Sequence, residues 1–242
     1  MQAWPYPRWI AHRGAGHLAP ENTLAAFRLG AHHGYRMFEC DAKLSADGVP
    51  FLMHDATLER TTNGTGVGGE RPWSELSRLD AGSWHSRAYA GEPLPTLESL
   101  ARYCIANGLF FNIEIKPTPG VEARTGTVVA EHAARWWKGR VPPLFTSFKV
   151  ESLQAAAAAQ PEIPRGLLVD NFTDGWLQRA QSLKCAALVC NHALWDSATV
   201  AAVHAVGMRC LSYTVNDEWA AERLIALGTD GIITDAVDRF AP

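Results

Sequence analysis

The chain has 242 residues, of which 47% are hydrophobic and 19% charged, and its formal net charge is −3 at pH 7. This length suits one large domain spanning residues 1–242, since α/β barrels commonly run to about 250 residues as a single unit. The slight acidic excess argues against a nucleic-acid or anionic-membrane surface, so a small molecule is the expected partner, while nothing in the pattern predicts an oligomeric state.

Two further features predict the cellular location. Residues 1–7 contain no basic segment followed by an apolar stretch, and nowhere do about 18 apolar residues run together. The five cysteines lie in apolar neighbourhoods without C-x-x-C spacing, which favours buried thiols over a disulfide framework or a zinc site. We therefore expect a soluble, cytoplasmic protein without membrane insertion.

Apolar runs of strand length alternate with segments of helical period along the whole chain, which is typical of βα units around a parallel sheet. The predicted strands are residues 9–12, 37–41, 109–115, 144–148, 166–170, 187–191, 208–214 and 231–234. The predicted helices are residues 21–33, 97–106, 121–137, 150–159, 175–183, 197–206 and 218–227. Eight strands with intervening helices favour a closed (β/α)8 barrel, the TIM barrel, over an open sheet.

One connection interrupts this alternation. Residues 45–95 include a Gly/Asn-rich stretch, residues 63–69, and only short ordered pieces, among them a short strand expected over residues 49–54. No Gly-Lys-Ser/Thr and no helix start follow the glycines, so turns explain them better than a nucleotide-binding loop. We expect a long loop insertion after the second strand, above the barrel.

Three polar strings mark the ends of predicted strands: His12-Arg13-Gly14, Glu39-Cys40-Asp41 and Glu114-Ile115-Lys116. Alternate side chains of a strand share a face, so Glu39 and Asp41 point together, as do Glu114 and Lys116. Any one pair is equally well explained by an exposed strand end or a surface ion pair. Because all lie at the carboxyl ends of strands, where barrel enzymes build active sites, together they predict a metal and phosphate site.

Two histidines are placed to join this site. His12 ends the first strand, and His54, followed by Asp55, ends a short apolar segment in the insertion. Arg13 offers a planar fork that suits a phosphate, and a salt bridge to one of the carboxylates is compatible with that role. His17 and His192 remain open between a role in the site and a structural one.

These three motifs and five others occur in a characteristic order between residues 9 and 237. They are His12-Arg13-Gly14, Pro20-Glu21-Asn22-Thr23, Glu39-x-Asp41, His54-Asp55, Leu58-x-Arg60-Thr61, Leu94-Pro95-Thr96-Leu97, Glu114-x-Lys116 and Gly231-Ile232-Ile233-Thr234-Asp235. This order resembles the glycerophosphodiester phosphodiesterase family. Trp4-Pro5-Tyr6-Pro7, Asp80-Ala81-Gly82-Ser83-Trp84 and Asn112-Ile113-Glu114-Ile115-Lys116-Pro117 are especially similar to its bacterial cytoplasmic branch, which is associated with glycerol 3-phosphate uptake.

The resemblance implies roles for individual residues. Glu39, Asp41 and Glu114 would hold a divalent cation, and His12 and His54 would be the general acid and base. A donor set made only of oxygen suits Mg²⁺ or Ca²⁺. Arg13 and Lys116 would bind the phosphoryl charge. Tyr213 stands where many relatives carry tryptophan, and it retains an aromatic wall for the substrate.

We therefore predict metal-dependent hydrolysis of glycerophosphodiesters, such as glycerophosphocholine or glycerophosphoethanolamine, to glycerol 3-phosphate and an alcohol. Attack by a vicinal glycerol hydroxyl, through a cyclic phosphate, and direct attack by water both remain open. A lysophospholipid substrate would require an apolar groove or membrane-facing loop, and the polar insertion offers little of either. A non-catalytic phosphodiester-binding barrel would need no pair of proton-transfer histidines.

Overall fold

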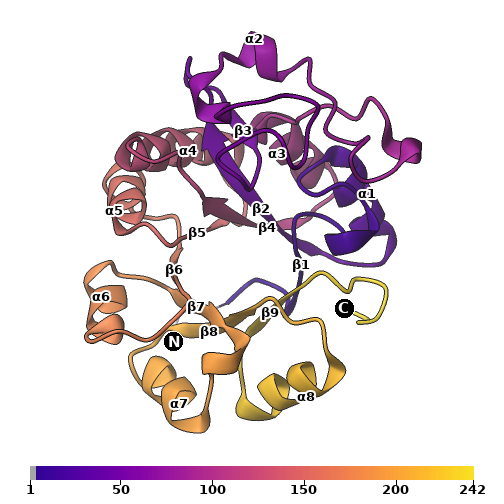
Figure 1. Cartoon of the computed structure of the whole chain (residues 1–242). Coiled ribbons are helices and arrows are strands. Elements are labelled where there is room, and N and C mark those ends of the chain that lie inside the picture. Colours follow the sequence, from indigo (N-terminus) through magenta and orange to yellow (C-terminus); the bar gives the residue numbers. More distant parts are fainter. Residues whose placement is uncertain (1–3) are drawn as a thin grey trace.

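The computed structural model describes residues 4–242, so the first three residues of the N-terminal segment considered above lie outside the described part. Within this range, eight parallel strands close into a barrel (Figure 1). They are β1 (Trp9–Ala11), β2 (Met37–Leu44), β4 (Phe110–Ile115), β5 (Leu144–Ser147), β6 (Arg165–Val169), β7 (Ala187–Asn191), β8 (Arg209–Tyr213) and β9 (Gly231–Thr234). The barrel closes because β1 pairs with both β9 and β2, and the predicted TIM barrel is confirmed.

Helices follow the strands and surround the barrel (Figure 1). They are α1 (Leu24–His32), α3 (Leu97–Ala106), α4 (Glu122–Trp136), α5 (Val150–Ala159), α6 (Trp176–Ser182), α7 (Ser197–Ala205) and α8 (Glu218–Leu227). Helices α3, α5 and α8 begin and end at the predicted residues. No helix within residues 4–242 is long and apolar enough to cross a membrane, and the five cysteines are buried free thiols, as predicted.

The start of α1 differs from the prediction in a way that matters for the site. The helix was expected from residue 21, but α1 begins at Leu24, with Thr23 as its N-cap. Asn22 takes a left-handed φ of 59°, which a helix cannot accommodate. Its side-chain amide donates to Asp41 Oδ2 at 2.8 Å and accepts from the Asp41 backbone N–H at 3.1 Å. Asn22 thus lies outside the helix and fixes Asp41.

The barrel interior divides into an apolar lower part and a polar mouth. Apolar strand side chains fill the lower part: Ile10, Met37, Leu144, Leu168, Ala187, Val189, Leu211 and Ile233. The charged residues of β2 and β4 lie nearer the carboxyl ends of their strands. Because side chains fill a barrel of this size, the polar groups are accessible only from the C-terminal face.

The insertion after β2 is a packed unit on one side of this mouth. It contains β3 (Pro50–Leu52), α2 (Trp73–Leu76) and two 3₁₀ turns, Gly68–Glu70 and Arg87–Tyr89. Strand β3 pairs antiparallel with residues 42–44, which is why β2 continues beyond the predicted end at Asp41. The insertion has its own apolar cluster, formed by Phe51, Met53, Leu58, Leu76, Ala81 and Leu94. The predicted extra strand is confirmed. Packing of the apolar cluster around β3 holds the residues that follow this strand in place.

A close contact between α1 and the loop after β1 leads to a prediction. A Cβ atom on Gly30 would lie 2.1 Å from the Gly14 carbonyl oxygen. We expect Gly30→Ala to lower the free energy of unfolding by about 1–3 kcal/mol, despite the better helix propensity of alanine, because the overlap must displace backbone. Urea titration would measure this, with Arg28→Ala on the exposed face of α1 as the control, expected to stay within about 0.5 kcal/mol. An unchanged midpoint for Gly30→Ala would contradict the contact.

Candidate active site

Three carboxylates from two neighbouring strands converge at the C-terminal mouth of the barrel. Asp41 of β2 stands in register with Glu114 of β4, and Glu39 lies on the same face of β2. Oxygen atoms of the three groups lie within 4.8 Å of one another. Glu39, Asp41 and Glu114 are only 3%, 1% and 9% exposed. Like charges buried this close together require a compensating cation or a proton.

The electrostatics of this triad fit a hard divalent cation. Burial and the neighbouring carboxylates raise the pKa of Glu39 well above its usual range and that of Glu114 to about 7. Burial opposes ionisation of Asp41 too, but Arg13 and Lys116 hold its pKa far below the usual range. Glu39 Oε1 and Asp41 Oδ1 are buried and accept no hydrogen bond within residues 4–242. Unsatisfied carboxylate oxygens are the ligands that Mg²⁺ and Ca²⁺ prefer.

Two basic side chains cover the triad. Arg13 Nε lies 3.2 Å from Asp41 Oδ2, and Arg13 Nη1 lies 3.0 Å from Glu21 Oε1. Lys116 Nζ lies 2.9 Å from Glu114 Oε1 and 3.4 Å from Asp41 Oδ1. The salt bridges considered for Arg13 are therefore present, and both cations also line the cavity above the carboxylates.

His12 is fixed by a carboxylate that directly follows β9, the last strand of the barrel. Its Nδ1 lies 2.6 Å from Asp235 Oδ1, and its Nε2 lies 3.8 Å from Glu39 Oε2. Asn216 Nδ2 donates to Asp235 Oδ2 at 3.0 Å. Burial opposes ionisation of Asp235, but the hydrogen bond from His12 lowers its pKa to about 2. An ionised carboxylate only accepts hydrogen bonds, so Nδ1 of His12 carries the proton and Nε2 is directed toward the triad.

His54, in the insertion, is held in the same manner. Its Nδ1 lies 2.7 Å from Asp55 Oδ1. Arg60 Nε donates to Asp55 Oδ2 at 2.6 Å, and Arg60 Nη1 and Nη2 donate to the two Glu21 oxygens at 2.8 and 2.7 Å. Burial lowers the pKa of His54. A continuous set of ion pairs therefore joins the histidine of the insertion, through Glu21 and Arg13, to the carboxylates of the barrel.

These side chains share one cavity of about 250 Å³. Seven of the eight predicted site residues line it: His12, Arg13, Glu39, His54, Glu114, Lys116 and Tyr213. Asp41 contacts Arg13 and Lys116 beneath them. The Tyr213 hydroxyl donates to the Val169 carbonyl at 2.9 Å, and its ring meets Phe148 edge-on at 5.9 Å between centroids. The structure thus brings together residues that are spread along most of the chain.

Several residues of the site were assigned no role from the sequence. Asn22, Arg60 and Asp235 belong to motifs that were recognised, but their partners are distant in the sequence. Lys43 continues the face of β2 that carries Glu39 and Asp41, so alternation was the available signal. Its Nζ donates to the Lys116 carbonyl at 3.0 Å, and burial lowers the pKa of Lys43 to about 8.

The two undecided histidines lie apart from the cavity. His17 is exposed, with Nε2 3.5 Å from Asp235 Oδ2. The backbone carbonyl of His192 accepts a hydrogen bond from Arg223 at 2.6 Å. Neither residue lines the cavity.

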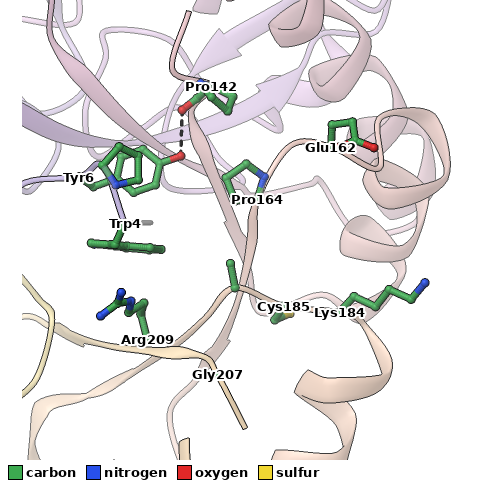
Figure 2. Close-up of a pocket in the computed structure, with 11 residues that line it drawn as sticks. Trp4, Tyr6, Pro142, Glu162, Pro164, Lys184, Cys185, Gly207 and Arg209 are labelled. Atoms are coloured by element: carbon green, nitrogen blue, oxygen red, sulfur yellow. Dashed lines mark hydrogen bonds between the residues drawn. The ribbon is translucent and has the colours of Figure 1, made fainter. Parts of the chain in front are cut away.

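Figure 2 shows a different cavity, of about 360 Å³. Pro142, Pro164 and Ala186 line it just before β5, β6 and β7 begin, so it lies at the opposite end of the barrel. The Trp4 ring lies between Tyr6 and Arg209, whose guanidinium carbon is 5.9 Å from the ring centroid. The Tyr6 hydroxyl donates to the Pro142 carbonyl at 2.9 Å. No histidine and no group of carboxylates is found among the described residues that line this cavity. This cavity therefore lacks the groups that suggest chemistry at the C-terminal mouth.

Comparison with known proteins agrees with this geometry. Residues 12–239 match the sequence model of the Glycerophosphoryl diester phosphodiesterase family. The glycerophosphodiester phosphodiesterase of Caldanaerobacter subterraneus is 32% identical over 234 residues, which cover 93% of each chain. YhdW of Bacillus subtilis is 35% identical over 236 residues, covering 95% of this chain and 94% of that protein.

Solved structures resemble this chain in fold as well as in sequence. A phosphodiesterase from Oleispira antarctica, in complex with the product sn-glycerol-3-phosphate, is 38% identical with a TM-score of 0.92, covering 96% of this chain and 94% of that chain. The glycerophosphodiester phosphodiesterase of Agrobacterium tumefaciens is 30% identical with a TM-score of 0.82, covering 98% and 99%. The chain therefore belongs to the glycerophosphoryl diester phosphodiesterase family of enzymes.

Proposed function

We propose that this protein hydrolyses glycerophosphodiesters to glycerol 3-phosphate and an alcohol, with a divalent cation bound by Glu39, Asp41 and Glu114. The convergence of three buried carboxylates with two aspartate-bound histidines in one cavity carries this proposal. Family membership supports the reaction class. The glycerol 3-phosphate complex of the Oleispira protein supports a substrate that contains glycerol phosphate.

The chain's own residues provide the proton transfers. One of His12 and His54 accepts the proton of the attacking hydroxyl, and the other donates a proton to the departing alcohol oxygen. Such steps are each worth about 10²–10⁴-fold in rate. Asp235 and Asp55 keep the proton on Nδ1 of each imidazole, so that Nε2 exchanges protons with the substrate.

The remaining groups bind and orient the diester. A bound cation would neutralise charge on the phosphoryl group and lower the pKa of an attacking hydroxyl. Arg13 and Lys116 stabilise the charge that develops on the phosphoryl oxygens, and Tyr213 forms a wall for the glycerol moiety. The same groups serve attack by a glycerol hydroxyl or by water.

We also propose a cytoplasmic location and a single domain over residues 1–242. Five buried free thiols suit a reducing compartment.

The first test is release of glycerol 3-phosphate from glycerophosphocholine by chelator-treated protein supplied with Mg²⁺, Ca²⁺ or no metal. We expect release only with metal, because the triad without a cation cannot neutralise the phosphoryl charge. Faster turnover of lysophosphatidylcholine would favour a lysophospholipid phosphodiesterase. Tight binding without product would favour a non-catalytic binding barrel, and would contradict the proposal.

Glu114→Gln tests the cation site by stability as well as by activity. In the wild type, a cation at 100 times its Kd should stabilise the fold by about 2.7 kcal/mol, and the variant should gain much less and lose metal-dependent turnover. Because the pKa of Glu114 is raised to about 7, ionising it destabilises the metal-free fold. The melting temperature of metal-free wild type should thus fall as the pH rises from about 4.5 through 7, and the variant should show a smaller fall. An equal metal-induced shift in both proteins would remove Glu114 from the cation site.

Asp235→Asn tests the positioning of His12. We expect kcat/KM to fall by about 10²-fold or more, since the imidazole loses its fixed tautomer and orientation. Asp238→Asn, near the end of the chain, is the control and should keep wild-type kinetics. Wild-type kcat/KM in Asp235→Asn would show that Asp235 only stabilises the fold.

A further inference from the structure

A second cavity, of about 310 Å³, adjoins the one described above. Four residues line both cavities: His54, Glu114, Lys116 and Phe148. His12 and Arg13 line only the first cavity. The Lys116 ammonium lies 5.9 Å from the centroid of the Phe148 ring, and both side chains lie where the two cavities adjoin.

We propose that the second cavity binds the leaving alcohol of the diester and selects alcohols that carry no positive charge. This inference rests on the proposed hydrolysis, in which the attacking and departing oxygens lie on opposite sides of phosphorus. The bond from phosphorus to the attacking oxygen forms, and the bond to the alcohol oxygen breaks. His12, in the first cavity only, takes the proton of the attacking hydroxyl, and His54, at the junction, gives a proton to the departing oxygen.

The walls of the second cavity suit the carbon skeleton of an alcohol. Apolar groups of Ala56, Ile115, Pro117, Pro119 and Phe148 line it. Pro117 and Pro119 follow β4, so the wall is rigid and its backbone presents few N–H donors. Contact with this surface stabilises the apolar part of a bound alcohol by removing it from water.

Three lysines and two carboxylates line the cavity: Lys43, Lys116 and Lys149, with Asp55 and Glu114. Lys116 is paired with Glu114, and Asp55 is paired with Arg60. Lys43 donates to a backbone carbonyl, and Lys149 is exposed and interacts electrostatically with Glu122. Among residues 4–242 neither Lys43 nor Lys149 forms an ion pair, so the unpaired charge of the lining is positive.

This arrangement disfavours a quaternary ammonium group. Recognition of such a group usually depends on the faces of several aromatic rings. Phe148 is the one aromatic residue among the described residues that line the cavity, and the Lys116 ammonium already lies near its ring. An uncharged polyol or an anionic alcohol therefore fits the cavity better than choline.

Glycerophosphoglycerol and glycerophosphocholine test this selection, because they share the glycerol phosphate half and differ in the charge of the alcohol. We expect the wild type, supplied with its activating metal, to show a higher kcat/KM for glycerophosphoglycerol. Lys149→Glu should raise kcat/KM for glycerophosphocholine relative to glycerophosphoglycerol by about 3- to 10-fold, as expected for reversing one exposed charge near the ligand. Lys138→Glu makes the same change in net charge beyond the end of α4, away from the cavity, and should leave the ratio unchanged.

The outcomes separate the inference from the function on which it rests. Release of glycerol 3-phosphate from neither compound would overturn both. Turnover of both compounds with a wild-type preference for glycerophosphocholine, or with the same ratio in wild type and Lys149→Glu, would overturn the leaving-alcohol site alone. An equal effect of Lys138→Glu would also overturn it, since net charge rather than the cavity would then set the preference.

Discussion

The burial of Glu39, Asp41 and Glu114 against one another at the C-terminal mouth of the barrel determines how the rest of the site is built. Charges of one sign repel strongly when water is excluded, so the fold must supply compensating groups. Arg13 and Lys116 provide positive charge from two different loops, and the Asn22 side chain adds hydrogen bonds to Asp41. Glu39 Oε1 and Asp41 Oδ1 nevertheless accept no hydrogen bond within residues 4–242, which leaves both oxygens available to a cation.

Arg60 links the insertion to the barrel and so completes the site. Exposed ion pairs usually contribute little to stability. Arg60, however, contacts two carboxylates, and each of these holds a second group of the site: Asp55 holds His54, and Glu21 holds Arg13. Movement of the insertion would therefore displace His54 and Arg13 together. The role of Arg60 is positional, and it explains how a loop far from the barrel axis supplies a residue to the site.

Local sequence patterns predicted most of the fold. In the barrel itself, strand ends apart from that of β2, and helix ends apart from the start of α1, lie within one residue of their predicted positions, because alternation and helical periodicity depend on neighbouring residues. Both exceptions have tertiary causes. Strand β2 extends because β3 pairs with it, and α1 starts late because Asn22 turns toward Asp41. Neither partner can be identified from the residues next to these ends.

Residue types and their spacing along the chain predicted the kinds of groups in the site: carboxylates, histidines and basic residues near the carboxyl ends of parallel strands, in an order that resembles one family. Residue type and alternation are local properties, so they can be recognised without a fold. Which of these groups contact one another depends on how the strands pair. His12 and Asp235 are 223 residues apart, and they come into contact because β1 pairs with β9 when the barrel closes. The division of the mouth into two cavities likewise depends on side chains from the insertion and from the loops after β4 and β5, whose relative positions are set by packing.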